Sequence, residues 1–174
     1  TVKAQEAIAA AQSLASEGGH ASVGPLHLLA ALLQQEGGIV PALLEKIGIS
    51  ADRAGQVVQA ELSRLPSQSS QAGLGMDPSL QEVLNRAERE AKDLGDDYTS
   101  TEHFLLALAE VGGPAKKALA ALGVDRNGLL SAMKDVRGNQ RVTDQNPEDK
   151  YQALQRYGRD LVEMAQAGKL DPVI

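Results

Sequence analysis

The chain contains two copies of one pattern, and this duplication constrains its fold more than any other feature of the sequence. Residues 5–8, Gln-Glu-Ala-Ile, recur at 81–84 as Gln-Glu-Val-Leu. Single residues repeat at the same offset of 76 positions: Glu6 and Glu82, Gly19 and Gly95, and His27 and His103. A constant offset over two helix-length segments indicates that one small helical unit has been copied and fused, as in repeat proteins. We therefore expect two similar units packed as a closed pair.

Each copy is expected to contain four helices. Apolar residues at three- and four-residue intervals predict an amphipathic first helix in each copy, ending at Gly18-Gly19 in the first and opened by Asp77-Pro78 in the second. The second helices, within 26–33 and 104–109, are apolar on nearly all sides, which is typical of buried helices. Third helices are expected near 40–47 and 115–122, and fourth helices near 51–64 and 125–136. The predicted fold class is all-α, with two tandem four-helix repeats related by pseudo-twofold symmetry, a flexible linker and one extra helix.

Polar stretches without periodicity divide the chain into segments. The predicted boundaries are 1–64 for the first repeat, 65–77 for the inter-repeat linker, 78–136 for the second repeat, 137–146 for a flexible linker and 147–174 for the start of a further module. Asn146-Pro147 is expected to begin the last helix, whose apolar stripe has no third copy to cover it. We therefore expect the chain to be a piece of a larger protein.

The composition argues against several classes of partner. A net charge of −6 and 2% aromatic residues are unfavourable for nucleic acid, which requires clustered cations and stacking platforms. No apolar run approaches the ~20 residues that span a bilayer, so we expect no membrane attachment. The sequence contains no cysteine, which fits a reducing compartment, and the expected location is the cytoplasm.

Enzyme chemistry finds little support in the sequence. His20, His27 and His103 lack the H-x-x-x-H or H-E-x-x-H spacing of a zinc helix, so a metal hydrolase is only a contrasting hypothesis. The carboxylate pairs, Glu88 with Glu90 and Asp96 with Asp97, do not face each other at their spacings. The charged run from Arg86 to Lys92 is expected to be solvated surface.

A family resemblance rests on three motifs. In each copy a helix and a glycine turn lead to Pro25-Leu26-His27-Leu28-Leu29 or Thr101-Glu102-His103-Phe104-Leu105. This doubled pattern resembles the N-terminal repeat domain of the Clp ATPase chaperones. The segments 142–161 and 168–174 are similar to the entry into the first ATPase module of the ClpB disaggregases. The resemblance covers essentially the whole chain.

The resemblance implies a mobile substrate-binding domain tethered to a hexameric ring that threads aggregated proteins, using ATP and the DnaK chaperone system. It implies unfolded or aggregated polypeptides as clients, a homohexameric parent protein, and a monomer for this fragment. The chain lacks a G-x-x-x-x-G-K-[ST] phosphate loop, so we expect ATP and Mg²⁺ to bind in ATPase modules outside it. The alternative is an adaptor- and substrate-docking domain of a ClpA- or ClpC-type unfoldase that feeds a protease.

Six residues are candidates for substrate binding. From the repeats alone, fusion of two similar units leaves a seam where both copies border a groove, a common place for an apolar peptide to dock. The resemblance implies that Val83 and Leu84 line this groove and that His103 occupies a position that is apolar in some relatives. It also implies roles in substrate handling for Thr1, Asp96 and Glu102.

Each polar candidate also has a structural interpretation. Thr1 stands where a helix N-cap is expected, and Asp96 follows Gly95 in a turn. Glu102 completes the run Thr99-Ser100-Thr101-Glu102, which reads as a capping box. The histidines at the starts of the second helices are expected to donate to a neighbouring carbonyl.

Overall fold

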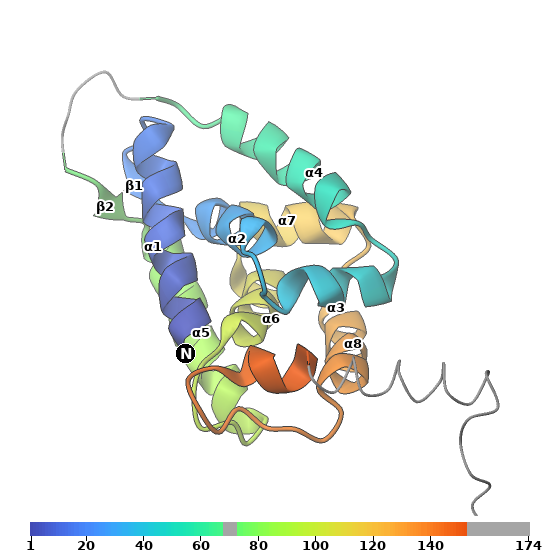
Figure 1. Cartoon of the computed structure of the whole chain (residues 1–174). Coiled ribbons are helices and arrows are strands. Elements are labelled where there is room, and N and C mark those ends of the chain that lie inside the picture. The colour runs from blue at the N-terminus through green and yellow to red at the C-terminus, as the bar shows by residue number, and fades with distance from the viewer. Residues whose placement is uncertain (68–72, 153–174) are drawn as a thin grey trace, which may run out of the picture.

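The computed structural model of the chain describes residues 1–67 and 73–152, which form an almost entirely helical bundle (Figure 1). The first copy consists of α1 (Val2–Glu17), β1 (Ser22–Val23), α2 (Pro25–Gln34), α3 (Val40–Ile47) and α4 (Ala51–Ser63). The second consists of β2 (Gly75–Met76), α5 (Pro78–Asp93), α6 (Thr101–Val111), α7 (Pro114–Ala121) and α8 (Arg126–Arg137). Residues 147–152 are also helical, and the rest of the predicted extra helix lies outside the described residues. The predicted all-α fold with four helices in each copy is confirmed.

Local sequence signals account for the ends of several helices. The Thr1 hydroxyl accepts a hydrogen bond from the Ala4 amide at 3.2 Å, which confirms Thr1 as the N-cap of α1. Asp77 caps α5 in the same way by accepting from the Ser79 amide at 2.9 Å. The turns after α1 and α5 contain Gly19 and Gly95 at φ values of 68° and 74°, a left-handed conformation that glycine adopts without strain.

The two repeats interlock through their third and fourth helices. Helix α4 packs against α2 of its own repeat and against α7 of the other, and α8 packs correspondingly against α6 and α3. Helices α2 and α6 lie at the centre, where their leucines are fully buried. Each repeat therefore helps to cover the fourth helix of the other. The two sets of contacts correspond, as expected for repeats related by pseudo-twofold symmetry.

The end of the predicted inter-repeat linker contains a short strand. Ser22 and Val23 of β1 pair in parallel with Gly75 and Met76 of β2, and the Asp77 amide donates to the Val23 carbonyl at 2.9 Å. A pairing of two residues on each side leaves no alternation of side chains along the sequence, which explains why periodicity did not indicate it. The bridge ties the start of α5 to the start of α2.

The segment predicted as a flexible linker, 137–146, contacts the helices in this structure. Arg137 is the last residue of α8, and Val142 is fully buried. The Val2 amide donates to the Gln145 carbonyl at 3.0 Å. We call residues 138–152 the strap. In Figure 1 the strap runs from the end of α8 along the lower end of the bundle to the start of α1, and returns as the short helix at 147–152.

Within the two described ranges, 1–67 and 73–152, the structure contains no helix that combines the length and the apolar character needed to cross a membrane.

Candidate functional site

Four of the six candidate residues meet at one end of the bundle. Thr1 begins α1, Asp96 lies in the α5–α6 turn, and Glu102 and His103 are in the first turn of α6. The Thr1 nitrogen donates to the Thr99 carbonyl at 2.9 Å and thereby joins the start of α1 to this turn. Three further buried residues, Arg137, Glu148 and Tyr151, lie in the same region. We call the following residues the polar cluster: Asp96, Glu102, His103, Arg137, Glu148 and Tyr151.

Asp96 is the centre of the polar cluster. Its carboxylate accepts hydrogen bonds from His103 Nε2 at 2.7 Å, from Arg137 Nη2 at 2.6 Å and from the Val142 amide at 2.9 Å. Burial by itself would raise the Asp96 pKa, but these three donors outweigh it and lower the pKa to about 2. Asp96 thus joins the start of α6, the end of α8 and the strap, which is a larger structural role than the turn expected from its sequence position.

His103 caps α6 from within the helix. Its Nδ1 accepts a hydrogen bond from the Ser100 amide at 2.8 Å, so the remaining ring nitrogen carries the proton that is donated to Asp96. The N-cap of α6 is Ser100 and the third helical residue is His103, so the predicted capping box of Glu102 is wrong by one position. The expectation that this histidine donates to a carbonyl is also wrong, because it accepts from a backbone N–H.

The first repeat contains the same arrangement with a different partner. His27 Nδ1 accepts from the Gly24 amide at 3.0 Å, and its Nε2 lies 2.8 Å from His20 Nδ1. His20 occupies the position that corresponds to Asp96. Burial and, secondarily, the neighbouring His20 lower the His27 pKa to about 4. The repeat therefore preserves the capping histidine, whereas its outer partner is an acid in one copy and an imidazole in the other.

Glu102 is a fully buried acid of the polar cluster. Its side chain is 0% exposed, and neither carboxylate oxygen accepts a hydrogen bond from the described residues. Burial raises the Glu102 pKa to about 7; His103 and Arg137 oppose this rise, while Glu148 and Asp96 add to it. Glu148 is also buried without a partner for its carboxylate, and burial raises its pKa as well. A buried acid whose pKa is raised to about 7 therefore lies at the start of α6.

The two apolar candidates, Val83 and Leu84, both lie on α5. Val83 is fully buried in the core, whereas Leu84 is partly exposed and packs at the margin of the core. Among the apolar candidates, only Leu84 therefore offers side-chain surface in this conformation. The roles of all six candidates in substrate binding stay predictions.

Two hollows lie beside the strap at the seam of the bundle, and none of the six candidate residues lines either of them. One hollow of about 120 Å³ lies between the first repeat and α8. Its lining comes from the first repeat at Gly37, Gly38, Ile39 and Ala42, from α8 at Val136, and from the strap at Glu148, Tyr151 and Gln152. A more open hollow of about 840 Å³ lies between α8, Leu94 and the strap residues 138–141. Both copies and the strap therefore meet at one edge of the bundle.

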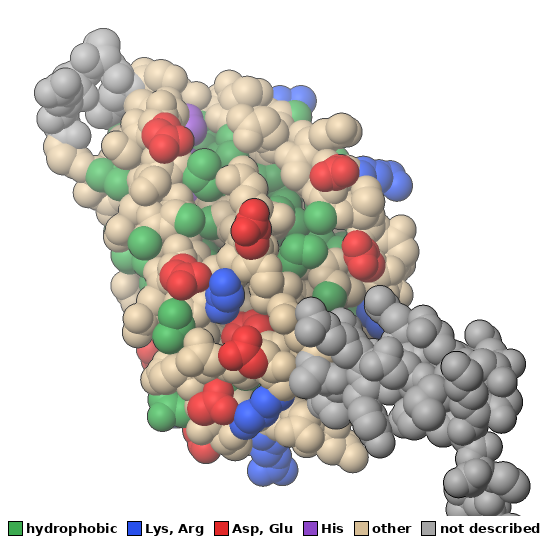
Figure 2. Space-filling model, viewed as in Figure 1, with side chains coloured by type: hydrophobic (Ala, Val, Ile, Leu, Met, Phe, Trp, Pro, Cys, Tyr) green, Lys and Arg blue, Asp and Glu red, His purple; other side chains and the backbone are tan. Residues whose placement is uncertain are grey.

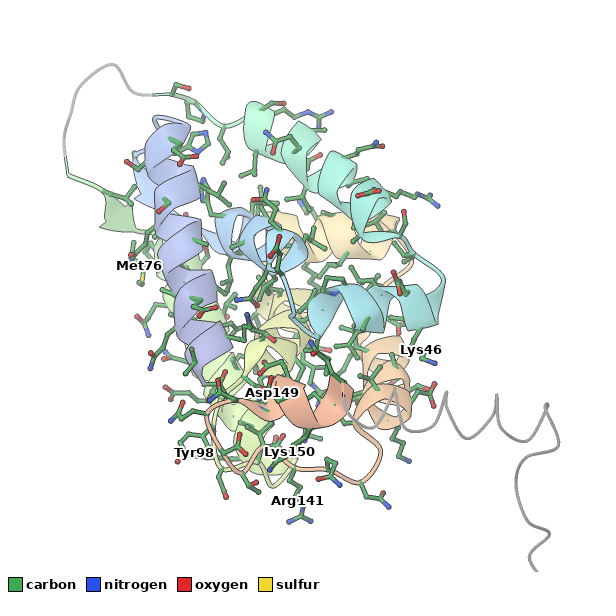
Figure 3. All side chains as sticks on the ribbon, viewed as in Figure 1. Lys46, Met76, Tyr98, Arg141, Asp149 and Lys150 are labelled. Carbon is green, nitrogen blue, oxygen red and sulfur yellow. The ribbon has the colours of Figure 1, made fainter. Side chains whose placement is uncertain are left out.

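Large apolar side chains are also exposed at scattered positions, namely Val2, Leu74, Met76 and Tyr98. Figure 3 shows Met76, the second residue of β2, and Tyr98, near the opposite end of α5, on one side of the molecule. On the face shown in Figure 2, acidic side chains are spread singly among small apolar patches and do not form one block. Across residues 1–67 and 73–152, His, Cys, Asp and Glu side chains do not gather into a group of three suited to a metal ion.

Four important residues were missed at the sequence level. Arg137, Glu148 and Tyr151 join the polar cluster from segments that were predicted to be linker or outside the repeats. Glu90 was expected to be solvated, yet it is 1% exposed and pairs with Arg86 at 3.0 Å and with Arg126. A signal for Glu90 existed, because it corresponds to the apolar Leu14 and continues the apolar stripe of its helix at a spacing of three residues.

Comparison with known proteins supports the predicted resemblance. The family model described as the Clp repeat (R) N-terminal domain matches residues 1–122. The chaperone protein ClpB of Rhodopirellula baltica is 44% identical over 174 residues, which cover 100% of this chain and 20% of the relative. ClpB of Bacillus cereus is 42% identical over 178 residues, covering 100% and 21%. The chain therefore spans about a fifth of the length of these curated relatives.

Solved structures share the fold. The Hsp104 N-terminal domain from Candida albicans superposes with a TM-score of 0.76 at 23% identity, covering 85% of this chain and 97% of that one. The N-terminal domain of the chaperone ClpD from Arabidopsis thaliana gives a TM-score of 0.56 at 26% identity, covering 76% and 92%.

Proposed function

We propose that this chain, which belongs to the Clp repeat N-terminal domain family, is the substrate-binding domain of a ClpB-type disaggregase. In this proposal it captures exposed apolar segments of unfolded or aggregated proteins in the cytoplasm. A hexameric ring formed by the parent protein then threads these clients, in cooperation with the DnaK chaperone system. ATP, Mg²⁺ and catalysis belong to ATPase modules outside this chain.

The observation that carries the proposal is the convergence of the polar candidates beside the seam. Thr1 lies at the start of α1, whereas Asp96 and Glu102 lie close together in the α5–α6 turn and the first turn of α6. The resemblance associates each of them with substrate handling. Their hydrogen bonds and charges gather where α1 and α6 begin and where the strap crosses the bundle. A shared location is what a common binding role requires, whereas three independent capping or turn residues have no need of it.

The chemistry of this region suits weak and promiscuous binding. Complete covering of one leucine side chain contributes about 1.5 to 3 kcal/mol, and Leu84 is already partly buried. The neighbouring carboxylates attract basic residues of a client without dictating its sequence. Low affinity for each client is compatible with threading, because six copies around a ring bind multivalently.

The proposal is tested by an NMR chemical-shift titration of this chain with a permanently unfolded polypeptide, reduced and carboxymethylated lactalbumin. We expect shifts to cluster at Leu84 and around Glu102 and His103, and we expect Leu84→Asp to abolish them while the fold is retained. Ile8→Asp is the matched control, because Ile8 is the corresponding, partly buried position of the first repeat. Absence of shifts at millimolar polypeptide in the folded protein would overturn the proposal.

A second candidate function is adaptor docking for a ClpA- or ClpC-type unfoldase. The shared fold and 26% identity with the ClpD domain keep this alternative open. The two functions differ in their ligands, since an adaptor-docking domain binds one folded partner at a defined surface. Saturable binding of a single folded protein, together with indifference to unfolded chains, would favour the alternative.

A further inference from the structure

We infer that the strap, residues 138–152, is a built-in occupant of the client-binding seam, so that a client segment binds by displacing it. This inference rests on the proposed function, and it makes the strap a segment that regulates access of clients to the binding site. It also specifies the kind of client segment that fits the site.

The strap is held by its backbone as much as by its side chains. The Val142 amide donates to Asp96 at 2.9 Å, and the Val142 carbonyl accepts from the Asp97 amide at 2.8 Å. Further along, the Gln145 carbonyl accepts from the Val2 amide at 3.0 Å. Backbone contacts of this kind are available to any extended polypeptide, because they do not depend on its sequence.

Two apolar side chains of the strap are buried. Val142 is 0% exposed and Tyr151 is 3% exposed. Tyr151 helps to line the hollow between Ile39 of the first repeat and Val136 of the second, and the Arg137 guanidinium lies 5.9 Å from the centre of its ring. The strap thus offers a buried aliphatic residue from its non-helical part and a buried aromatic residue from its short helix at 147–152, which are two kinds of side chain that an apolar segment of an unfolded protein also offers. The strap therefore presents to the domain what a client would present.

The closed strap leaves polar atoms without partners. Both carboxylate oxygens of Glu102, both of Glu148 and the Tyr151 hydroxyl are buried without a hydrogen bond from the described residues. Each such group loses its hydration in the closed state, and this loss opposes closure. The strap is thus held by good backbone bonds and opposed by unsatisfied acids, a balance that allows a competing segment to displace it.

This balance indicates the preferred client. The strap brings a second buried acid, Glu148, into the polar cluster, and Glu148 adds to the rise of the Glu102 pKa. A client segment with Lys or Arg at that place would neutralise the Glu102 carboxylate instead. We therefore expect extended segments that combine aliphatic or aromatic residues with one basic residue to displace the strap most effectively.

The test compares a released strap with a locked one in the chain 1–174. Val142→Asp places a carboxylate at a fully buried position of the strap and is expected to release it, and Thr143→Asp, at the exposed neighbouring position, is the matched control. The lock is the double variant Val2→Cys/Gln145→Cys, because the backbones of these residues are hydrogen bonded and the chain has no other cysteine. Formation of the disulfide is verified by mass spectrometry.

Binding of reduced, carboxymethylated lactalbumin is then measured by fluorescence anisotropy. Because an occluded site weakens apparent affinity by the fraction that is open, we expect Val142→Asp to tighten binding about tenfold. The oxidised lock should weaken binding at least as strongly, reduction should restore it, and Thr143→Asp should match the natural chain. In hydrogen exchange, the Val142 amide should lose protection when the unfolded polypeptide is added.

Two results would overturn the inference in distinguishable ways. Equal affinity of the released, locked and natural forms would show that the strap does not occupy the site, and the proposed function would stand. Failure of every form to bind, including the released one, would remove the proposed function and the inference together.

Discussion

His103 donates from Nε2 to Asp96 at 2.7 Å, and this hydrogen bond joins the capping residue of α6 to the carboxylate that holds the strap. The corresponding bond in the first repeat is the 2.8 Å contact between His27 and His20. The two capping histidines therefore have the same hydrogen-bond geometry, although one faces a carboxylate and the other faces an imidazole. The second copy has an acid at this position, and this acid also binds Arg137 and the Val142 amide.

Replacement of His20 by an acid should give His27 the same kind of electrostatic partner that His103 has in Asp96. In the variant His20→Asp, a carboxylate faces His27 as Asp96 faces His103. We expect the His27 pKa to rise from about 4 toward or above its ordinary value of about 6.5, because the charged imidazolium gains an anionic partner. NMR titration of the His27 ring measures the pKa. His20→Ala is the control, since it removes the second imidazole without adding a charge, and it should raise the pKa less; equal values in both variants would contradict the prediction.

Asp96→Asn should destabilise the domain and free the strap. The substitution removes the charge that Arg137 and His103 share, and it leaves a buried guanidinium without its anion. Loss of one partner of a buried pair costs about 3 to 5 kcal/mol, measured as the free energy of unfolding in urea. The exposed neighbour Asp97→Asn should change stability by no more than about 0.5 kcal/mol. A similar small loss for both variants would show that Asp96 is not the hub of the polar cluster.

The buried Glu102 should make stability fall as pH rises toward neutrality. Its pKa is raised from 4.5 to about 7 in the folded state, so its stabilising contribution is complete below pH 4.5 and is lost as pH rises to 7. The groups that face it are His103, Arg137, Glu148, Asp96, Tyr151 and the Thr1 amino group. Between pH 4.5 and pH 7, the free energy of unfolding of the natural chain should fall by up to about 3 kcal/mol relative to that of Glu102→Gln. Urea unfolding at each pH measures this difference.

The comparison with Glu102→Gln is needed because His27 acts in the opposite direction. Its lowered pKa gives stability that is present above pH 6.5 and is lost as pH falls to about 4. The two groups partly cancel in the natural chain, so its own pH profile is not diagnostic. A pH-independent difference between the two proteins would show that Glu102 stays ionised, or stays hydrated, throughout.

Glu90 should be required for stability although it lies in a charged helix. Its carboxylate is buried between Arg86 and Arg126, and it links α5 to the start of α8. We expect Glu90→Ala to cost about 1.5 to 3 kcal/mol in the free energy of unfolding, because hydrogen bonds to charged groups are lost. Glu88→Ala, which removes an exposed carboxylate from the same helix, should be close to neutral. Comparable losses would indicate that helix propensity, and not the buried pair, dominates.

The sequence predicted the helical elements well for identifiable reasons. The stripe of α1 stops at Gly18-Gly19, and Asp77-Pro78 opens α5, so these ends follow from interactions within a few residues. Prediction failed where a partner was distant in sequence. The capping box of α6 was misplaced by one position because Glu102 fits the sequence pattern of a capping box. In the structure the residue that accepts from the N-cap amide is His103, which also donates a hydrogen bond to Asp96.

The candidate site shows the same division. Thr1, Asp96, Glu102 and His103 were identified in the sequence through the resemblance, and the structure brings them together. Arg137 was treated as linker because a polar residue at a helix end is ordinarily solvated, and its burial depends on Asp96, 41 positions earlier. Tyr151 and Glu148 could not be placed, since nothing local shows that residues 147–152 pack into the seam of the repeats.

The sequence by itself determined the duplication, the four helices of each copy and the family, because these depend on spacing, periodicity and motifs that short-range physics enforces. Only the tertiary structure decided that each fourth helix also packs against the other repeat, that Glu102 is buried without a hydrogen-bond partner among the described residues and that the strap lies across the seam. The reason is physical. Burial and pKa are set by groups that arrive from distant parts of the chain, and the residues that carry the proposed function are those whose properties depend on such neighbours.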